Sequence, residues 1–385
     1  MTGTPLAILL AGDYPDDPRL GSSKVSFKLR EEFEALGHSC DVVWAREIGE
    51  RPASRQIRQL VSPWMAARAV ARRMARRRYD VVDIASAEGL WFGLRGRLGH
   101  RGRPAFVCRS HGLEHLNYAR MVDDHVEGVR SKSWARRLWY PASRLLQVAA
   151  AARLADRLLV LNEADRAFAV DRGWQPPERV AVISHGISER FLDNAPATDA
   201  PRGAGLLFCG TWDYVKGTTY LCAAINRVHA GGNKVRLTVL GPGAPAATVL
   251  SGFDAAVRPF VTVIDRVPED QVMAEYRRHD VLLWTSSYEG FGLVLIEAMS
   301  QGLPAIATPS GCAASVIRDG DNGVLVPFRS ADAVASAITD LLADASVRRR
   351  LGAAARASVL GLTWRATAER TLALYRDAIA TRVPA

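Results

Sequence analysis

The sequence predicts an α/β protein built from two doubly wound domains, and three observations support this prediction. Short apolar runs alternate with helix-favouring segments through the first half of the chain. After a stretch at 194–204 that is rich in Ala, Pro and Gly, the same alternation starts again. Glycine-containing loops follow several of the apolar runs. This alternation is typical of parallel sheets with helices on both faces. Ligands bind at the carboxyl ends of such strands, so we expect a site in a cleft that both domains face.

The first domain is expected to cover residues 1–193. A polar loop at 12–23 follows the first strand, and a helix at Lys24–Leu36 ends at Gly37. Further helices are expected near Gly89–Leu98 and, in a long amphipathic region, across 113–155. The expected strands are Leu6–Ala11, Asp41–Ala45, Asp80–Ala85, Ala105–Arg109, Arg157–Asn162 and Val180–Ser184.

Residues 194–204 are the expected linker, and 205–364 the second domain. The last two helices are expected near 331–343 and 364–380. The expected strands of this half are Gly205–Cys209, Val235–Leu240, Val261–Asp265, Val281–Trp284, Ala305–Thr308 and Gly323–Val326.

The composition indicates a folded protein of the cytoplasm. Of 385 residues, 48% are hydrophobic, which suffices for sizeable cores. No apolar run approaches the roughly 20 residues that span a bilayer. The start of the chain has no basic region before its apolar residues, so it reads as a strand and not as a signal peptide. The five cysteines lack metal-like spacing, which favours buried free thiols in a reducing compartment.

The net charge of +10 is unevenly placed. Residues 1–195 carry 31 Lys and Arg against 23 Asp and Glu, and the densest cluster runs from Arg68 to Arg78. One interpretation is a solvated helix face. The other is an anionic partner, either an acidic membrane surface on the inner face of the membrane or a lipid-phosphate acceptor. Nucleic acid is not expected, because no recognition motif accompanies the charge.

The most informative stretch runs from Ser287 to Met299, with the sequence SYEGFGLVLIEAM. It follows an apolar run and precedes a helix-favouring segment, so it predicts strand, tight loop and helix start. Gly290 and Gly292 allow close approach of a ligand to the backbone, and free N–H groups of the helix face that ligand. Glu289 and Glu297 are candidates for binding sugar hydroxyls, because a carboxylate accepts two hydrogen bonds at once.

Lys216 and Gly217 form the second candidate site. A cation just before a helix, with a glycine beside it, is typical of a diphosphate site. Gly241-Pro242-Gly243-Ala244-Pro245-Ala246 also follows a strand and matches a dinucleotide fingerprint, with Asp265 at a fitting distance. Prolines fill two of its variable positions, which favours a turn that admits a nucleotide base.

His111 and His185 each end a strand and are each followed by glycine. The strand-end position favours a functional role for His111 and a structural one for His185. No clustered His, Cys or Asp suggests a metal site, and no nucleophile-elbow motif is present.

Taken together, these motifs resemble the retaining glycosyltransferases of the GT-B fold, family four. The likeness rests on segments from most of the chain: Gly37-His38, Arg109 to Gly112, Asp156 to Leu161, Ile183 to Gly186, Gly210 to Gly217, Glu289 to Met299, Gln301 to Pro304, Asp319 to Val326 and Thr363-Trp364. The resemblance implies transfer from a nucleotide-diphosphate sugar to a glycan, lipid-linked or small-molecule acceptor, with retention at the anomeric carbon, without metal or other cofactor, and within glycoconjugate or polysaccharide biosynthesis. It also implies that the helix at about 365–385 packs back on the first domain, which binds the acceptor.

The resemblance implies a role for each matching residue. Three residues would serve catalysis. Glu289 would bind the sugar with its carboxylate, Lys216 would neutralise the phosphate, and His111 would line the sugar. Glu297 would bind the ribose. Gly21 and Ser22 would lie in a loop near the leaving phosphate and the acceptor. Further donor contacts would come from Gly290, Phe291, Gly292, Leu293, Gly210, Thr211 and Gly241.

Four positions depart from the family pattern. Thr211 stands where the family has arginine, so either Lys216 acts alone with backbone groups or an arginine elsewhere supplies the second charge. Ser315 stands for Glu, His185 for Asn, and Gly311-Cys312 for Gly-Gly. Two alternative functions remain open at this stage: a nucleotide-sugar epimerase of the same fold, and a sugar-nucleotide-binding protein with weak catalysis.

Overall fold

The computed structural model describes residues 4–17, 21–50, 52–97, 102–126, 134–193 and 202–382. The chain divides into two compact units. Unit 1 comprises Met1–His185 together with Trp364–Ala385, and unit 2 comprises Gly186–Thr363. The units thus divide at Gly186, earlier than the expected linker, most of which lies outside the described residues. Helix α9 (Glu189–Asp193) belongs to unit 2, where it packs on α13 (Leu293–Ser300).

Unit 1 is a parallel sheet of six strands in the order β2-β1-β3-β4-β5-β6. The strands are β1 (Ala7–Ala11), β2 (Ser39–Val43), β3 (Val81–Ala85), β4 (Ala105–Arg109), β5 (Arg157–Val160) and β6 (Val180–Val182). All six expected strands are present, and the strand order reverses between β1 and β3. The helices are α1 (Gly21–Ala35), α2 (Ala45–Ile48), α3 (Arg55–Met74), α4 (Leu90–Arg97), α5 (Glu114–Val126), α6 (Trp134–Tyr140), α7 (Leu146–Leu154), α8 (Glu163–Asp171) and α17 (Trp364–Ala380), with short turns η1 (Ser86–Gly89), η2 (Pro141–Leu145) and η3 (Pro177–Arg179).

Unit 2 is also a parallel sheet of six strands, in the order β12-β11-β10-β7-β8-β9. The strands are β7 (Leu206–Cys209), β8 (Leu237–Leu240), β9 (Val261–Ile264), β10 (Val281–Trp284), β11 (Ala305–Ala307) and β12 (Val324–Leu325). Its other helices are α10 (Thr218–Ala230), α11 (Ala246–Leu250), α12 (Glu269–Arg278), α14 (Ala313–Val316), α15 (Ala331–Ala343) and α16 (Ala345–Val359), with short turns η4 (Tyr214–Lys216) and η5 (Arg258–Phe260). The expected strands are again all present. Helix α16 was not expected, although Asp344 caps its start by accepting from the Ser346 and Val347 N–H groups.

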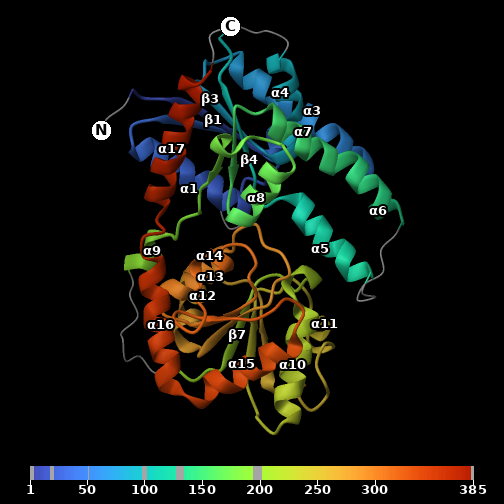
Figure 1. Cartoon of the computed structure of the whole chain (residues 1–385), viewed down its shortest axis with the longest axis vertical. Helices are drawn as coiled ribbons and strands as arrows, with labels where there is room; N and C mark the ends of the chain where they lie inside the picture. Colours follow the sequence, from blue (N-terminus) through green and yellow to red (C-terminus); the bar gives the residue numbers. More distant parts are fainter. Residues whose placement is uncertain are drawn as a thin grey trace. The chain divides into compact units, whose positions relative to one another are not determined.

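Helix α17 returns to unit 1 and packs beside α1 and against β4, as Figure 1 shows for the red helix near the blue one. A buried polar contact ties it to the sheet. Tyr375 of α17 donates to Asp83 Oδ2 at 2.5 Å, and the Arg109 guanidinium pairs with the same carboxylate at 2.6 Å. All three side chains are buried. Because a buried charge is costly unless it is paired, this contact makes α17 an integral part of unit 1.

Each sheet packs apolar side chains against the helices that cover it. In unit 1, Val82, Ile84, Phe106 and Cys108 point from the central strands toward α4 and α7. In unit 2, Leu206, Phe208 and neighbouring apolar residues pack with α10 and α15. The cores leave the carboxyl ends of the strands to the loops, and these loops carry the candidate sites.

Candidate functional site

The reversal of strand order in unit 2 lies between β7 and β10, which are neighbours in the sheet. Loops that leave this point diverge to opposite faces, which is where doubly wound sheets bind ligands. The loop after β7 begins at Gly210, whose φ of 140° suits glycine. The loop after β10 begins at Thr285. Most of the residues expected to bind the donor in unit 2 lie in these two loops or at the start of the helix that follows the second.

The two loops are joined by hydrogen bonds. Thr285 Oγ1 donates to the Lys216 carbonyl at 2.9 Å, and the Ser287 N–H donates to the Val215 carbonyl at 2.8 Å. Gly217 has a φ of 69°, and a Cβ there would lie 2.0 Å from the Thr285 carbonyl oxygen. Any side chain at 217 would therefore separate the loops. Close packing between them places the Lys216 side chain over the loop that carries Glu289.

Lys216 and Glu289 form an ion pair, with Nζ 2.6 Å from Oε1. Ser286 Oγ donates to the same oxygen at 2.7 Å. The side chains keep 28% and 11% of their surface exposed, so both are accessible at the edge of the sheet. Two residues that the sequence singled out separately, 73 positions apart, thus meet at one point. A cation beside a hydroxyl-accepting carboxylate can bind a phosphate and a sugar together.

Residues 311–312 pack against the loop that carries Glu289 and bind it through a hydrogen bond. The Cys312 N–H donates to the Phe291 carbonyl at 2.7 Å. Gly311 has a φ of 58°, and a Cβ there would lie 2.8 Å from Glu289 Cβ. The departure from the family's Gly-Gly therefore retains the glycine that this contact needs.

Gly292 is also constrained by the protein itself. Gly292 caps α13 with a φ of 109°, and a Cβ there would lie 2.8 Å from Cζ2 of Trp284. The Trp284 ring therefore leaves no room for a side chain at 292. Leu293 begins α13, and Phe291 is buried, so these two residues would offer a ligand their backbone groups only.

Glu297 lies in the middle of α13 and is buried. Burial raises the pKa of the Cys209 thiol at the end of β7 to about 12, and the Glu297 charge adds to that effect. Burial is the main cause of the raised pKa of Tyr276, and the Glu297 charge raises it further. The Glu297 carboxylate therefore lies near the end of β7, at the same strand edge as Lys216.

The glycines of the loop after β8 face an arginine. A Cβ at Gly241 would lie 3.7 Å from Arg266 Cγ, and one at Gly243 would lie 3.7 Å from Arg266 Nη2. The Trp212 N–H donates to the Pro242 carbonyl at 2.7 Å, which links this loop to the one after β7. Arg266 is thus a cation near the loop in which Thr211 stands for arginine. Sequence inspection did not find it, because it follows β9 without a recognisable motif.

The dinucleotide interpretation of Gly241 to Ala246 is not favoured by the structure. The segment follows β8, whereas that fingerprint belongs to the loop at the strand-order reversal. The helix that it opens, α11, has only five residues. The loop is instead a turn between the loop after β7 and the segment after β9, at the same edge of the sheet.

In unit 1, His111 follows β4 and contacts Tyr14 from the loop after β1. The Tyr14 hydroxyl lies 2.9 Å from His111 Nε2. Burial, and then the nearby Arg109 charge, lower the pKa of His111 to about 3. His111 is therefore a neutral imidazole at physiological pH. His185 is buried and stacks on Trp364 at 5.6 Å, which supports the structural role expected for it.

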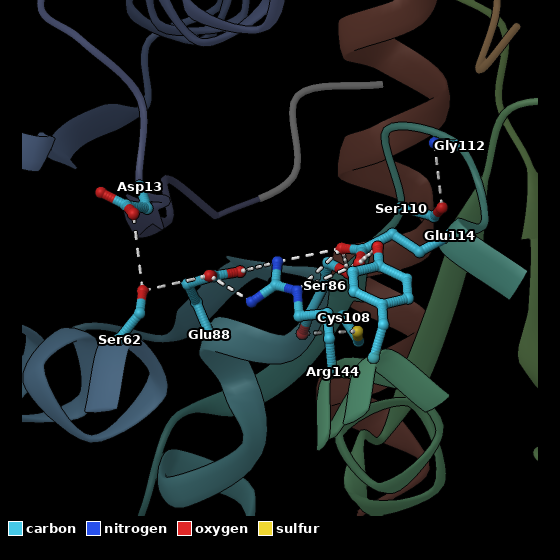
Figure 2. A network of polar contacts seen from close by, with 10 residues as sticks. Asp13, Ser62, Ser86, Glu88, Cys108, Ser110, Gly112, Glu114 and Arg144 are labelled. Atoms are coloured by element: carbon cyan, nitrogen blue, oxygen red, sulfur yellow. Dashed lines mark hydrogen bonds and ion pairs between the residues drawn. The ribbon is translucent and has the colours of Figure 1, made fainter. Parts of the chain in front are cut away.

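A network of polar side chains lies close by in unit 1, and no sequence motif indicated it. Figure 2 shows Arg144 between two carboxylates. Its Nη1 lies 2.8 Å from Glu88 Oε1, and its Nη2 lies 2.9 Å from Glu114 Oε1. Ser62 bridges Glu88 to Asp13, at 3.4 Å on each side. Burial alone would lower the pKa of Arg144, but the two carboxylates outweigh it and raise the pKa. The network fixes the loops after β1 and β3.

The remaining expected positions are less informative. Gly21 and Ser22 form the first turn of α1 and not a loop, because the helix begins three residues before the expected Lys24. Thr211 is exposed. Ser315 donates to the Cys312 carbonyl of its own helix at 2.9 Å.

No group of three or more His, Cys, Asp and Glu side chains in the described ranges could hold a metal ion. No helix in those ranges is both long and apolar enough to cross a membrane.

Two family models match this chain. Residues 21–191 match the model described as Glycosyltransferase Family 4, and residues 203–344 match the model described as Glycosyl transferases group 1. The chain belongs to the group 1 glycosyltransferases. Its two Rossmann-like sheets are those of the GT-B fold. The family matches also make it a glycosyltransferase enzyme.

Curated relatives and solved structures agree with this assignment. The chain is 27% identical over 336 residues to D-inositol 3-phosphate glycosyltransferase of Kribbella flavida, covering 82% of this chain and 76% of the relative. It is 31% identical to the enzyme of that name from Corynebacterium glutamicum over 53% of each chain. Sucrose-phosphate synthase from Thermosynechococcus elongatus superposes with a TM-score of 0.78 at 21% identity, covering 97% of this chain and 99% of that one. HepE of Anabaena, in complex with UDP and glucose, superposes with a TM-score of 0.67 at 15% identity, covering 96% of this chain and 100% of that one.

Proposed function

We propose that this group 1 glycosyltransferase transfers a sugar from a nucleotide-diphosphate donor with retention of the anomeric configuration. The observation that carries the proposal is the Lys216–Glu289 pair at the β7/β10 reversal. The Lys216 ammonium is a cation for the diphosphate, and the Glu289 carboxylate accepts hydrogen bonds from sugar hydroxyls. Each such charged contact contributes about 1.5–3 kcal/mol.

The other donor groups extend from this pair along the strand edge. The backbone groups of Gly290 to Leu293 bind the sugar or phosphate at the start of α13, because the positive end of a helix dipole favours anionic ligands. Glu297 binds the ribose, and Gly210, Thr211 and Gly241 border the nucleotide. Arg266 adds positive charge beside Gly241 and Gly243, which compensates in part for the threonine at 211.

Chemistry in this proposal consists of positioning and stabilisation of charge. As the bond between the anomeric carbon and the phosphate oxygen breaks, negative charge grows on the phosphate and is stabilised by Lys216. Oxocarbenium character develops on the sugar, and Glu289 holds its hydroxyls in place. The leaving phosphate accepts the acceptor's proton, so no separate base is required. Neutral His111 lines the sugar, and Gly21 and Ser22 border the acceptor.

The acceptor is proposed to bind unit 1. Inositol 3-phosphate is named as the substrate of the relatives from Kribbella and Corynebacterium, and it is the first acceptor to test. Glycan and lipid-linked acceptors are the next candidates. No bound metal or other cofactor takes part in the proposed reaction.

Thermal unfolding with UDP, GDP and ADP tests the donor part of the proposal. A ligand at about 100 times its Kd adds roughly 2.7 kcal/mol to stability. One of the three nucleotides should raise the Tm of the wild type, and Lys216→Met should reduce that increase. If none of them raises the Tm at millimolar concentration, the nucleotide-sugar donor is wrong. Turnover of the donor to an epimer without acceptor would favour the epimerase alternative.

A further inference from the structure

Large exposed hydrophobic side chains are concentrated on one set of helices. Among the described residues there are nine, and only Leu360 lies in unit 2. Three lie on α3, two on α4, two on α6 and one on α7: Ile57, Leu60, Trp64, Trp91, Leu94, Leu138, Trp139 and Leu146. Exposed leucines are ordinary when scattered, but eight on four neighbouring helices call for a partner.

These helices form one layer on unit 1. Helix α3 packs against α4, and α4 packs against α7. Helix α6 leads into α7 through η2, which also contacts α3. Figure 1 shows α3, α4 and α7 gathered together, with α6 continuing from them. We call the exposed side of α3, α4, α6 and α7 the outer helical face.

Helix α3 has apolar and basic parts on the same exposed stripe. Ile57, Leu60 and Trp64 follow one another at intervals of three and four residues and are 52%, 42% and 46% exposed. Arg68 and Arg72 continue the same spacing, which places them on the same side of the helix. The Arg68 guanidinium lies 4.7 Å from the centre of the Trp64 ring.

The arginine cluster at 68–78 divides into two groups. Arg73 pairs with Glu47 at 2.7 Å, and Arg77 pairs with Asp41 at 3.2 Å, so the protein itself compensates these charges. Arg68, Arg72, Arg76 and Arg78 are exposed, and Arg72 donates to the Glu47 carbonyl at 2.6 Å. The cluster therefore offers an anionic partner less uncompensated positive charge than six arginines would. The exposed apolar side chains of α3 lie next to it.

We propose that the outer helical face docks on the surface of an anionic lipid bilayer, with Ile57, Leu60 and Trp64 inserted at the interface. A helix with an apolar stripe and adjacent arginines lies in the interfacial plane of such bilayers. Tryptophan suits that depth because its ring is apolar and its N–H is polar. Exposed Arg68, Arg76 and Arg78 lie at headgroup level, where basic side chains are attracted to anionic lipids. The excess of positive charge in residues 1–195 has the sign that this partner needs.

Co-sedimentation of the full chain with vesicles tests the proposal. The vesicles are phosphatidylcholine alone and phosphatidylcholine with about 30% phosphatidylglycerol, each at about 0.1 M and about 0.5 M KCl. Binding should be confined to the anionic vesicles and should weaken with salt. A measurable part of the binding should persist at high salt, because salt does not screen the insertion of apolar side chains.

Matched variants separate the two components. Trp64→Gln should lower the partition coefficient about tenfold at both salt concentrations, and Arg68→Gln should lower it about fivefold at low salt only. The controls are Leu360→Gln, at a similarly exposed leucine, and Arg349→Gln, at an exposed arginine, both in unit 2. Both controls should bind like the wild type.

Three results would overturn the proposal: equal binding to neutral vesicles, Trp64→Gln binding like Leu360→Gln, or no vesicle binding. In the last case, a dimer in sedimentation equilibrium that Trp64→Gln dissociates would assign the face to a second copy of the chain. Nucleotide-induced thermal shifts are recorded on the same preparations, so loss of vesicle binding is distinguishable from loss of the donor site.

Discussion

Lys216 and Glu289 lie 2.6 Å apart, from Nζ to Oε1, although 73 positions separate them in the chain. The contact exists because the loops after β7 and β10 leave neighbouring strands at the point where strand order reverses. It places the cation that we propose for the phosphate in contact with the carboxylate that we propose for the sugar. It also means that each charge is compensated by the other.

Lys216→Met removes the cation while keeping most of the side-chain length. We expect kcat to fall by about one to two orders of magnitude, because one charged hydrogen bond to the leaving phosphate contributes about 1.5–3 kcal/mol. Steady-state transfer assays at saturating donor measure this. Lys234→Met, at an exposed lysine of the same unit, is the control. Equal kcat values for the two variants would remove Lys216 from the site.

Gly292→Ala tests the packing of the Glu289 loop. Its φ of 109° strains any side chain, and the new Cβ would meet the Trp284 ring at 2.8 Å. We expect the free energy of unfolding in urea to fall by about 1–3 kcal/mol. Gly361→Ala is the control, because Gly361 has open space around its Cβ position and no φ in the left-handed region. If both variants unfold alike, the strain at 292 is absent.

His111 is expected to remain neutral throughout the physiological range. Its pKa of about 3 in the folded protein is below the ordinary 6.5. The unfolded chain therefore binds the proton first, and stability contributed by the neutral ring is present above pH 6.5 and lost as pH falls toward 3. NMR of ring-labelled histidine, assigned with His111→Gln, should show no titration of this residue between pH 5 and 8. A midpoint near 6.5 would contradict the lowered pKa of His111.

Asp165 is expected to give a pH dependence of the opposite sign. Burial raises the pKa of its carboxyl group from 3.8 to about 7. Between these values the unfolded chain releases the proton and the folded protein keeps it, so stability falls as pH rises from about 4 to about 7. Asp165→Asn should remove that slope in urea unfolding, and Asp171→Asn, on an exposed residue of the same helix, should keep it. An unchanged slope in Asp165→Asn would contradict the prediction.

Much of the fold could be predicted because each strand is a short apolar run bounded by turn residues. All the expected strands of both sheets are present, with ends shifted by a few residues. The sequence also indicated that Lys216 and Glu289 belong to one kind of site. Their contact could not be predicted from local pattern, because it depends on which strands are neighbours.

Other features carried no local signal. Arg144 meets Glu88 and Glu114 only through tertiary packing. Arg266 reaches Gly243 from a different strand, so no motif contains both. The Trp284 ring packs against Gly292 from an earlier strand, so the spacing of the glycines did not indicate this contact. Helix α16 was missed although Asp344 could have indicated its start.

The most direct test of the central claim is sugar transfer by Glu289→Gln. The substitution keeps the side chain's shape and removes the negative charge, which accepts a hydrogen bond from Ser286 Oγ and is proposed to accept others from the sugar. Proton NMR of the product gives both the rate and the anomeric configuration. The account predicts a wild-type product with the donor's anomeric configuration, a rate at least about 100-fold lower in Glu289→Gln, and an unaffected Asp332→Asn control at an exposed carboxylate. An inverted product, or a Glu289→Gln rate near that of the wild type, would contradict it.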